Sequence, residues 1–228
     1  MKRGDLMKFL KLDLRLMKWM MVVLLISIIM AFLMKWASGG DNYSYITINT
    51  LSFSFADTFM IIFIIFTTNF YISIYAQKDQ LKIDPFIKSL PYMKKEKLLY
   101  DISFVTLTHL IVILISVLYC SFYDEWYKLF SMIMIIGTQL IINVCSFYLN
   151  CYQKSKRTWL GVIGGILGFI IITFHFIGIV NDHFGKVDLS EYHFLLYQLP
   201  LVVIVLGFIM IVITYFYYKK IGFHLYKN

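Results

Sequence analysis

The chain has 228 residues, of which 60% are hydrophobic, 18% aromatic and only 15% charged. Soluble domains carry roughly 25% charged residues, so these proportions and a mean hydropathy of +0.76 exclude an ordinary soluble domain. Six membrane spans need roughly 120 residues. The chain supplies them with only short connections left over, so we expect residues 1–228 to form a single all-α transmembrane domain.

Residues 5–18 have the pattern of an amphipathic helix lying on the membrane surface. Leu6, Leu10, Leu14 and Met17 recur at helical intervals. The complementary face is basic and consists of Lys8, Lys11, Arg15 and Lys18. A solvated tail is the alternative interpretation.

Residues 19–36 form the first apolar run, with Trp19 at its start and Trp36 at its end. On a helix these tryptophans would lie roughly 25 Å apart, close to the thickness of the hydrocarbon layer, as expected for an aromatic belt. The apolar part of a cleaved signal peptide is shorter, about 7–15 residues, so we interpret this run as a retained helix. The remaining predicted spans are about residues 55–76, 101–120, 129–149, 159–180 and 199–218.

The second span carries an aromatic stripe, because four phenylalanines recur at intervals of four, three and four residues. Such a stripe is suited to an amphipathic or lipid-like cargo. The residues expected to line a translocation path are Phe59, Phe63, Phe66, Asn69 and Phe70, together with His175 in the fifth span. Lipid exposure or packing within the bundle is the alternative.

Between the second and third spans, residues 84–91 predict a short cytoplasmic helix. Asp84 suits an N-cap and Pro85 the first helical position, while Pro91 ends the turn. Phe86, Ile87 and Leu90 share one face. The residues alone leave open whether that face contacts the bilayer surface or a groove in another protein.

The fifth span opens with four glycines in two overlapping G-x-x-x-G patterns, which allow another helix or subunit to approach closely. They are Gly161, Gly164, Gly165 and Gly168. Residues 181–200 then form a polar segment that we expect to be an external cap or a re-entrant, half-inserted helix.

The positive charge is distributed unevenly along the chain. If the N-terminus is cytoplasmic, the inner segments hold 18 of the 21 Lys and Arg residues, and only Lys35, Lys128 and Lys186 lie outside. This asymmetry follows the positive-inside rule and places both termini in the cytoplasm. The net charge of +8 therefore indicates topology and attraction to anionic lipids rather than a nucleic-acid partner.

Polar residues inside the predicted spans are few, and none is a carboxylate at mid-depth. A proton- or sodium-driven carrier usually needs such a group, so its absence disfavours secondary transport. We expect His109 and His175 to be hydrogen-bond partners between helices. The sequence has no zinc-peptidase, serine-hydrolase or P-loop motif, so we predict no enzyme activity, no metal site and no cofactor in this chain.

One segment resembles a known family. Lys88-Ser89-Leu90-Pro91, followed by Tyr92-Met93-Lys94-Lys95-Glu96-Lys97, resembles the S-L-P signature of ABC-2 type transporter permeases. In that family the motif follows the second span, as here, and forms the coupling helix that docks on the ATPase. The chain departs from the pattern in two features. Lys78-Asp79-Gln80-Leu81 precedes the motif where a Glu-x-Gly-Thr-like stretch is common, and Met93 replaces a small hydroxyl residue.

The resemblance implies a type V exporter fold and a permease subunit of an ATP-driven exporter in a bacterial cell membrane. The coupling residues would be Asp84, Pro85, Phe86, Ile87, Leu90 and Pro91. The implied partners are a cytoplasmic ATPase that binds Mg-ATP, a second permease subunit and membrane lipids. The small size is similar to that of Gram-positive exporters of peptides and toxins, including phenol-soluble modulins. An ATP-independent carrier or channel, or a non-transporting assembly subunit, remains an alternative.

Overall fold

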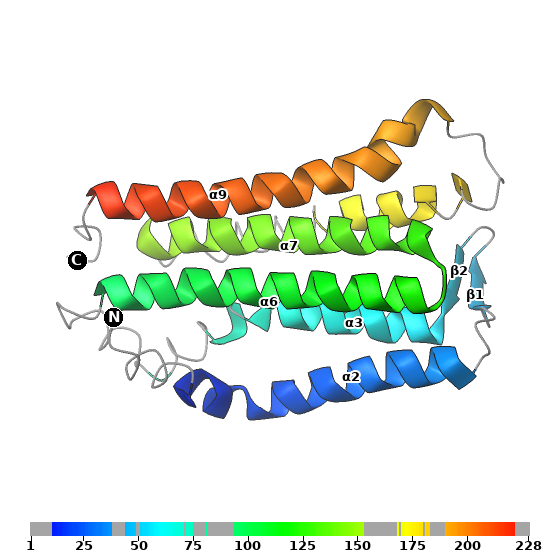
Figure 1. The fold of residues 1–228 in the computed structure, drawn as a ribbon, viewed down its shortest axis with the longest axis horizontal. Coiled ribbons are helices and arrows are strands. Elements are labelled where there is room, and N and C mark those ends of the chain that lie inside the picture. Colours follow the sequence, from blue (N-terminus) through cyan, green and yellow to red (C-terminus); the bar gives the residue numbers. More distant parts are fainter. Residues whose placement is uncertain are drawn as a thin grey trace.

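The structure is a computed structural model that describes residues 11–37, 44–48, 51–70, 72–74, 94–152, 170–179, 181–182 and 190–221, and the single residues 81 and 168. These residues form an elongated bundle of helices that run alternately up and down its long axis (Figure 1). The expectation of a mainly helical chain is confirmed. The predicted coupling helix at residues 84–91 and the glycines Gly161, Gly164 and Gly165 lie outside the described residues.

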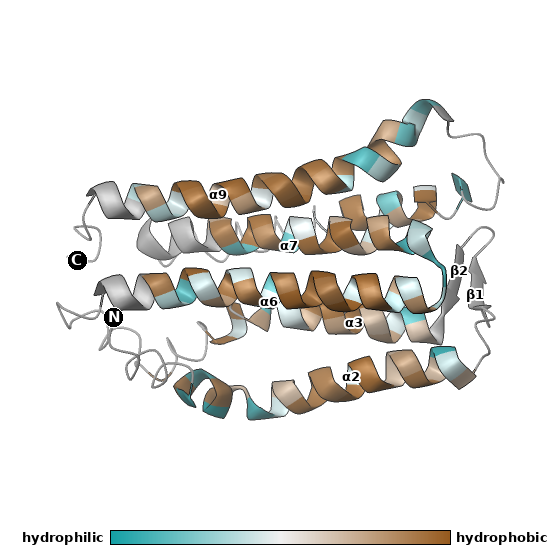
Figure 2. Ribbon diagram, in the orientation of Figure 1, coloured by the Kyte–Doolittle hydropathy of each residue, from teal (hydrophilic) through white to brown (hydrophobic). Residues whose placement is uncertain are grey.

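Among the described residues, four helices are long and apolar enough to cross a membrane, and they fall where spans were predicted. They belong to α2 (Lys18–Ala37), α6 (Lys94–Phe122), α7 (Trp126–Tyr152) and α9 (Leu199–Ile221). The second predicted span appears as α3 (Phe55–Thr68), and further helical residues follow it up to residue 74. The fifth appears as a helical stretch at residues 170–179. Apolar residues fill the middle of the helices, and hydrophilic ones lie towards their ends (Figure 2).

A short β-hairpin that was not predicted precedes α3. Its strands β1 (Ser44–Ile48) and β2 (Leu51–Ser54) pair in an antiparallel register, with Ile48 opposite Leu51 and an irregularity between Ser44 and Ile46. A signal was present in the sequence, because apolar and polar side chains alternate over residues 46–48 and again over residues 51–54, as they do in half-buried strands. We call this end of the bundle the hairpin end, and the opposite end, where residues 11–18 and the start of α6 lie, the basic end.

Helix α7 is the centre of the bundle and packs against α3, α6 and α9. Its buried side chains include Ile135, Ile136 and Leu140, which share a core with Met60 and Ile64 of α3. The outer faces of the surrounding helices are exposed and apolar. On α2 they include Leu25, Ile26 and Leu33, and on α9 they include Val205, Val212 and Ile213. Such a continuous apolar surface is what a lipid environment requires.

Glycines bring α7 and α9 into close contact. A Cβ atom added at Gly137 of α7 would lie 3.0 Å from the backbone nitrogen of Ile204. A Cβ atom added at Gly207 of α9 would lie 2.7 Å from Cδ2 of Leu140. The predicted packing glycine Gly168 contacts α7 less tightly, with Thr138 Cγ2 at 3.4 Å from its added Cβ. The close packing of α7 against α9 therefore depends on two single glycines outside the predicted fifth span.

We predict that Gly137→Ala destabilises the bundle by about 1–3 kcal/mol, because the new methyl group meets backbone atoms that cannot turn away. Gly168→Ala is the matched control, since its methyl group would make an ordinary van der Waals contact. Thermal unfolding of the detergent-solubilised protein, followed by size-exclusion fluorescence, measures both variants. Equal melting temperatures for the two variants would contradict the role of Gly137.

Candidate functional site: a buried ionic cluster at the hairpin end

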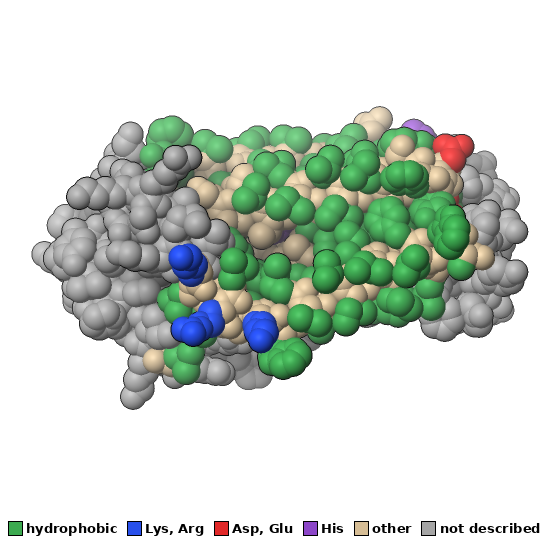
Figure 3. All heavy atoms as spheres, turned by 60° about the horizontal axis from the view of Figure 1, so that its bottom comes forward, with side chains coloured by type: hydrophobic (Ala, Val, Ile, Leu, Met, Phe, Trp, Pro, Cys, Tyr) green, Lys and Arg blue, Asp and Glu red, His purple; other side chains and the backbone are tan. Residues whose placement is uncertain are grey.

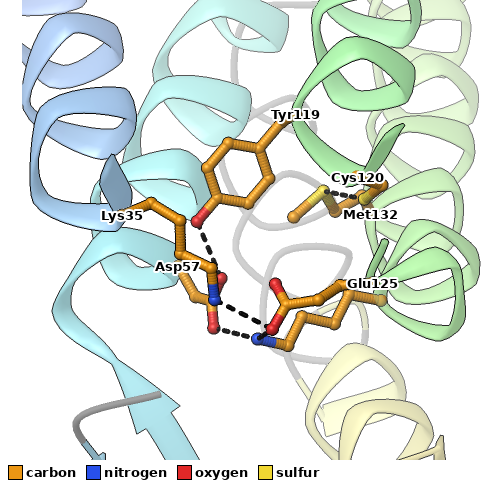
Figure 4. A network of polar contacts seen from close by, with 7 residues as sticks. Lys35, Asp57, Tyr119, Cys120, Glu125 and Met132 are labelled. Atoms are coloured by element: carbon orange, nitrogen blue, oxygen red, sulfur yellow. Dashed lines mark hydrogen bonds and ion pairs between the residues drawn. The ribbon is translucent and has the colours of Figure 1, made fainter. Parts of the chain in front are cut away.

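Four charged side chains from three parts of the chain meet inside the bundle at the hairpin end (Figure 4). Lys35 Nζ lies 2.8 Å from Glu125 Oε1, and Lys128 Nζ lies 3.0 Å from the same oxygen. Lys128 Nζ also lies 2.6 Å from Asp57 Oδ2. All four side chains are buried, and Lys35 has 0% of its surface exposed. We call these residues the ionic cluster; its two positive and two negative charges cancel.

Helix ends place two of the four charges where the helix dipole favours them. Lys35 lies in the last turn of α2 and Asp57 in the first turn of α3. A helix carries partial negative charge at its C-terminus and partial positive charge at its N-terminus, so both positions stabilise the ions they hold. Lys128 occupies the first turn of α7, where the dipole is unfavourable, and two carboxylates compensate for it.

The turn between α6 and α7 aims Glu125 into the cluster. Asp124 has a φ of 53°, in the left-handed region, and the Glu125 amide donates to the Cys120 carbonyl at 3.0 Å. This six-to-one hydrogen bond after a left-handed residue is the Schellman arrangement that ends many helices. Asp is one of the few side chains that tolerate this conformation. The chain reverses within three residues and directs Glu125 inwards.

Tyrosines complete the cluster. The Tyr119 hydroxyl donates to Asp57 Oδ1 at 2.9 Å, and the Tyr123 hydroxyl donates to the Phe32 carbonyl at 3.1 Å. Lys35 Nζ lies 5.7 Å from the centre of the Tyr123 ring, within the range of a cation–π contact. Burial and the nearby Glu125 carboxylate raise the pKa of the Tyr123 phenol, which keeps it a hydrogen-bond donor.

The cluster joins α2, α3, α6 and α7 at one point. Separating α2, α3 or α7 from the others would leave an unpaired charge in a buried site, which costs several kcal/mol. Within the described part of the chain, no group of three or more His, Cys, Asp or Glu residues is placed to hold a metal ion. The ion pairs and hydrogen bonds of the cluster link the helices that contribute to it.

A second polar contact lies near the middle of the bundle. His109 Nδ1 lies 2.7 Å from the Val105 carbonyl of its own helix, and its Nε2 lies 3.5 Å from Asn143 Nδ2. Asn143 Nδ2 also donates to the Thr68 carbonyl at 2.8 Å. Asn143 Oδ1 is buried and has no hydrogen-bond partner among the described residues. This contact links α3, α6 and α7, as expected for a histidine between helices.

His175 supports a bend at the start of α9. Residues Phe194–Gln198 form a π-helix that runs directly into α9, so Pro200 does not end the helix. Proline has no N–H to donate to the carbonyl four residues earlier, which is that of Leu196. His175 Nε2 lies 2.9 Å from that oxygen, and Gly178 leaves room for the Leu196 side chain. The external segment predicted as re-entrant is thus tied here to the helix at residues 170–179.

The aromatic stripe of α3 faces two environments. Phe63 and Phe70 are buried in the core of the chain, and Phe70 stacks on Phe104 of α6 with ring centres 5.8 Å apart. Phe59 is partly buried, whereas Phe66 is 44% exposed. Asn69 Nδ2 donates to the Ile65 carbonyl of its own helix. The predicted path residues therefore do not line one surface in this arrangement.

The ionic cluster was missed in the sequence, although a signal was present. Lys35 and Lys128 are two of the three exceptions to the inward bias of basic residues, and each lies next to the end of a span. A cation next to the end of a span is either exposed to water or paired with an anion. Only the packing of the helices identifies its partner, because Lys35 and Glu125 are 90 residues apart in sequence.

We predict that Lys35→Met and Glu125→Gln each destabilise the protein, because each leaves the buried cluster with a net charge. A loss of about 3–5 kcal/mol is expected for Lys35→Met. The double variant Lys35→Met, Glu125→Gln restores neutrality and should lose much less than the sum of the single losses. A double-mutant cycle measured by unfolding in detergent tests this coupling, and additive losses would contradict it.

Cys120 provides an internal reporter of the same cluster. Its thiol is buried, 3.9 Å from Met132 Sδ, in the region that the cluster closes. With Cys145 and Cys151 replaced by Ser, we expect a membrane-impermeant maleimide to leave Cys120 unmodified in otherwise wild-type protein. Lys35→Met should make Cys120 reactive, and the neutral double variant should protect it again. Labelling at equal rates in all three proteins would show that the cluster does not control access to Cys120.

No family model, curated protein or solved structure matches this chain. Its function must therefore be inferred from its own residues and their arrangement.

Proposed function

We propose that this chain is the membrane permease subunit of an ATP-driven ABC exporter that moves an amphipathic or hydrophobic cargo, such as a peptide, toxin, drug or lipid, out of the cell. The proposal is based on the Lys88-Ser89-Leu90-Pro91 motif and the basic residues that follow it. A short helix with an apolar face between two spans would offer an ATPase a surface to bind.

The position of the motif in the sequence supports this proposal. It lies in the connection between the last described residues after α3 and the start of α6. At its far end α3 contributes Asp57 to the ionic cluster, and at its far end α6 contributes Tyr119, whose hydroxyl donates to Asp57. A displacement of residues 85–91 would thus act directly on α3 and α6. ATP-driven closure of two ATPases would shift this segment and tilt the helices, as a rigid-body switch between two states.

The proposed topology has six spans, with both termini cytoplasmic, in a bacterial cell membrane. The lipid-suited outer faces of α2, α6 and α9 and the inward bias of Lys and Arg support it. Mg-ATP would be bound by the partner ATPase. A second permease subunit, identical or different, would complete the pathway between the two subunits.

The environments of the phenylalanine stripe suggest how cargo would meet α3. Phe66 is exposed and available to cargo or to the second subunit without rearrangement. Phe63 and Phe70 would reach a pathway only after α3 separates from α6 and α7. The path would then form during the transport cycle and be closed in the resting chain.

We predict that the double variant Phe86→Asp, Leu90→Asp abolishes binding of the ATPase, because two carboxylates would enter an apolar contact. The tagged chain is purified from its native membranes, and vanadate-sensitive ATP hydrolysis in the eluate is measured together with cargo efflux from cells. Leu81→Asp is the matched control, since Leu81 is an exposed leucine in the same connection, outside residues 85–91.

Co-purification of the ATPase with the Phe86, Leu90 double variant at wild-type levels would contradict the coupling role. Flux through liposomes that contain this chain alone, without ATP, would favour the carrier or channel alternative. An unchanged efflux in cells that lack the chain would favour a non-transporting assembly subunit.

A further inference from the structure

A basic and apolar stripe runs along the outside of the bundle at the basic end. It consists of five exposed residues on the helical stretch 11–16 and the start of α2, namely Lys11, Leu14, Arg15, Lys18 and Trp19. Their spacing of three and four residues places them on one face. Helical hydrogen bonds continue through the turn at Met17, from its amide to the Asp13 carbonyl and from the Met21 amide to the Met17 carbonyl, both 3.0 Å long. We call this surface the basic stripe.

Asp13, the acidic residue of the helical stretch 11–16, points away from the basic stripe. Asp13 is buried, and its Oδ2 accepts a hydrogen bond of 2.7 Å from the Tyr100 hydroxyl of α6. Had Asp13 pointed outwards, it would have neutralised one of the three cations. With Asp13 inside, the charged side chains of the stripe are all positive, and the hydrogen bond to Tyr100 fixes the stripe relative to α6.

The composition of the stripe matches the boundary between lipid headgroups and acyl chains. Leu14 is 42% exposed and Trp19 is 78% exposed, so both are accessible at the surface. The Lys18 ammonium lies 5.9 Å from the centre of the Trp19 ring. Figure 3 shows Lys and Arg side chains gathered at one end of a broad apolar surface. Tryptophan and long basic side chains occupy this boundary in membrane proteins.

We propose that the basic stripe binds the phosphate headgroups of anionic phospholipids, with Leu14 and Trp19 in the adjoining acyl region. Two features favour a lipid over an acidic protein. The cations alternate with apolar side chains, and the stripe continues into the lipid-suited face of α2. The proposal does not rest on the transport function, because it requires only that the chain lies in a membrane.

Trp19 and Trp36 provide a matched pair of reporters for this site. Both are exposed, by 78% and 77%, at the two ends of the same helix. Lys18, beside Trp19, is exposed, whereas Lys35, beside Trp36, is buried in the ionic cluster. Two single-tryptophan proteins, each with the other three tryptophans replaced by Phe, are reconstituted in nanodiscs. Quenching by brominated phosphatidylglycerol is then compared with quenching by brominated phosphatidylcholine.

We expect Trp19 to be quenched with at least a threefold preference for the anionic lipid, because each basic residue near an anionic surface favours binding by about fivefold before screening. Trp36 should show a ratio near one. Replacing Lys11, Arg15 and Lys18 with Gln should lower the Trp19 ratio to that of Trp36, and replacing Lys11 and Lys18 with Arg should retain it. The preference should weaken in 1 M salt, where charges are screened within about 3 Å.

Equal ratios at Trp19 and Trp36, or a Trp19 ratio unchanged by the three Gln substitutions, would overturn the proposal. Soluble glycerol 3-phosphate distinguishes a lipid site from a site for free phosphate. We expect millimolar amounts of it to leave the preference unchanged, and competition would overturn the assignment to lipid. Elution of each variant at the wild-type size-exclusion volume shows that it is folded.

Discussion

The arrangement of the bundle depends on the pairing of charges that have no access to water. At the hairpin end, Glu125 accepts from two lysines, and one of these also contacts Asp57. Hydrophobic burial drives helices together in water but not within lipid, where association depends on packing and polar contacts. Apolar side chains on α2 or α3 would fit many neighbours about equally well. The paired charges allow only one arrangement of the helices, because any other arrangement leaves a buried ion without a partner.

The two ends of the bundle use charge differently. At the hairpin end, two cations and two anions are buried, and their charges cancel. At the basic end, Asp13 is drawn inside and the cations remain on the surface. The first arrangement connects helices to one another, and the second leaves the chain with a surface suited to anionic lipid. Between them, polar contacts such as that of Asn143 with Thr68 are neutral, as a hydrocarbon environment demands.

Much of this fold could be predicted from the sequence, because a membrane span is recognised from the hydropathy of a continuous run of residues. The apolar run at residues 19–36 corresponds to α2 almost residue for residue. Contacts between distant residues could not be predicted. Whether Lys35 meets Glu125 depends on which helices are neighbours and how each is rotated, and hydropathy carries little information on either. The hairpin at residues 44–54 is a different case, since its alternating pattern was visible and was missed. The segment at residues 84–91 remains a prediction from sequence.

The bend at the start of α9 has a mechanical consequence. Pro200 leaves the Leu196 carbonyl without its usual donor, and His175 lies within hydrogen-bond distance of it from another helix. The angle of the bend is therefore set from outside the helix that bends. Straightening α9 would require the stretch at residues 170–179 to move with it or to lose that hydrogen bond. As long as the bond is kept, the two segments move together. Because the acceptor of this hydrogen bond is an uncharged carbonyl, ionic strength would have little effect on the link between the two segments, while it would weaken the contacts of the basic stripe with lipid.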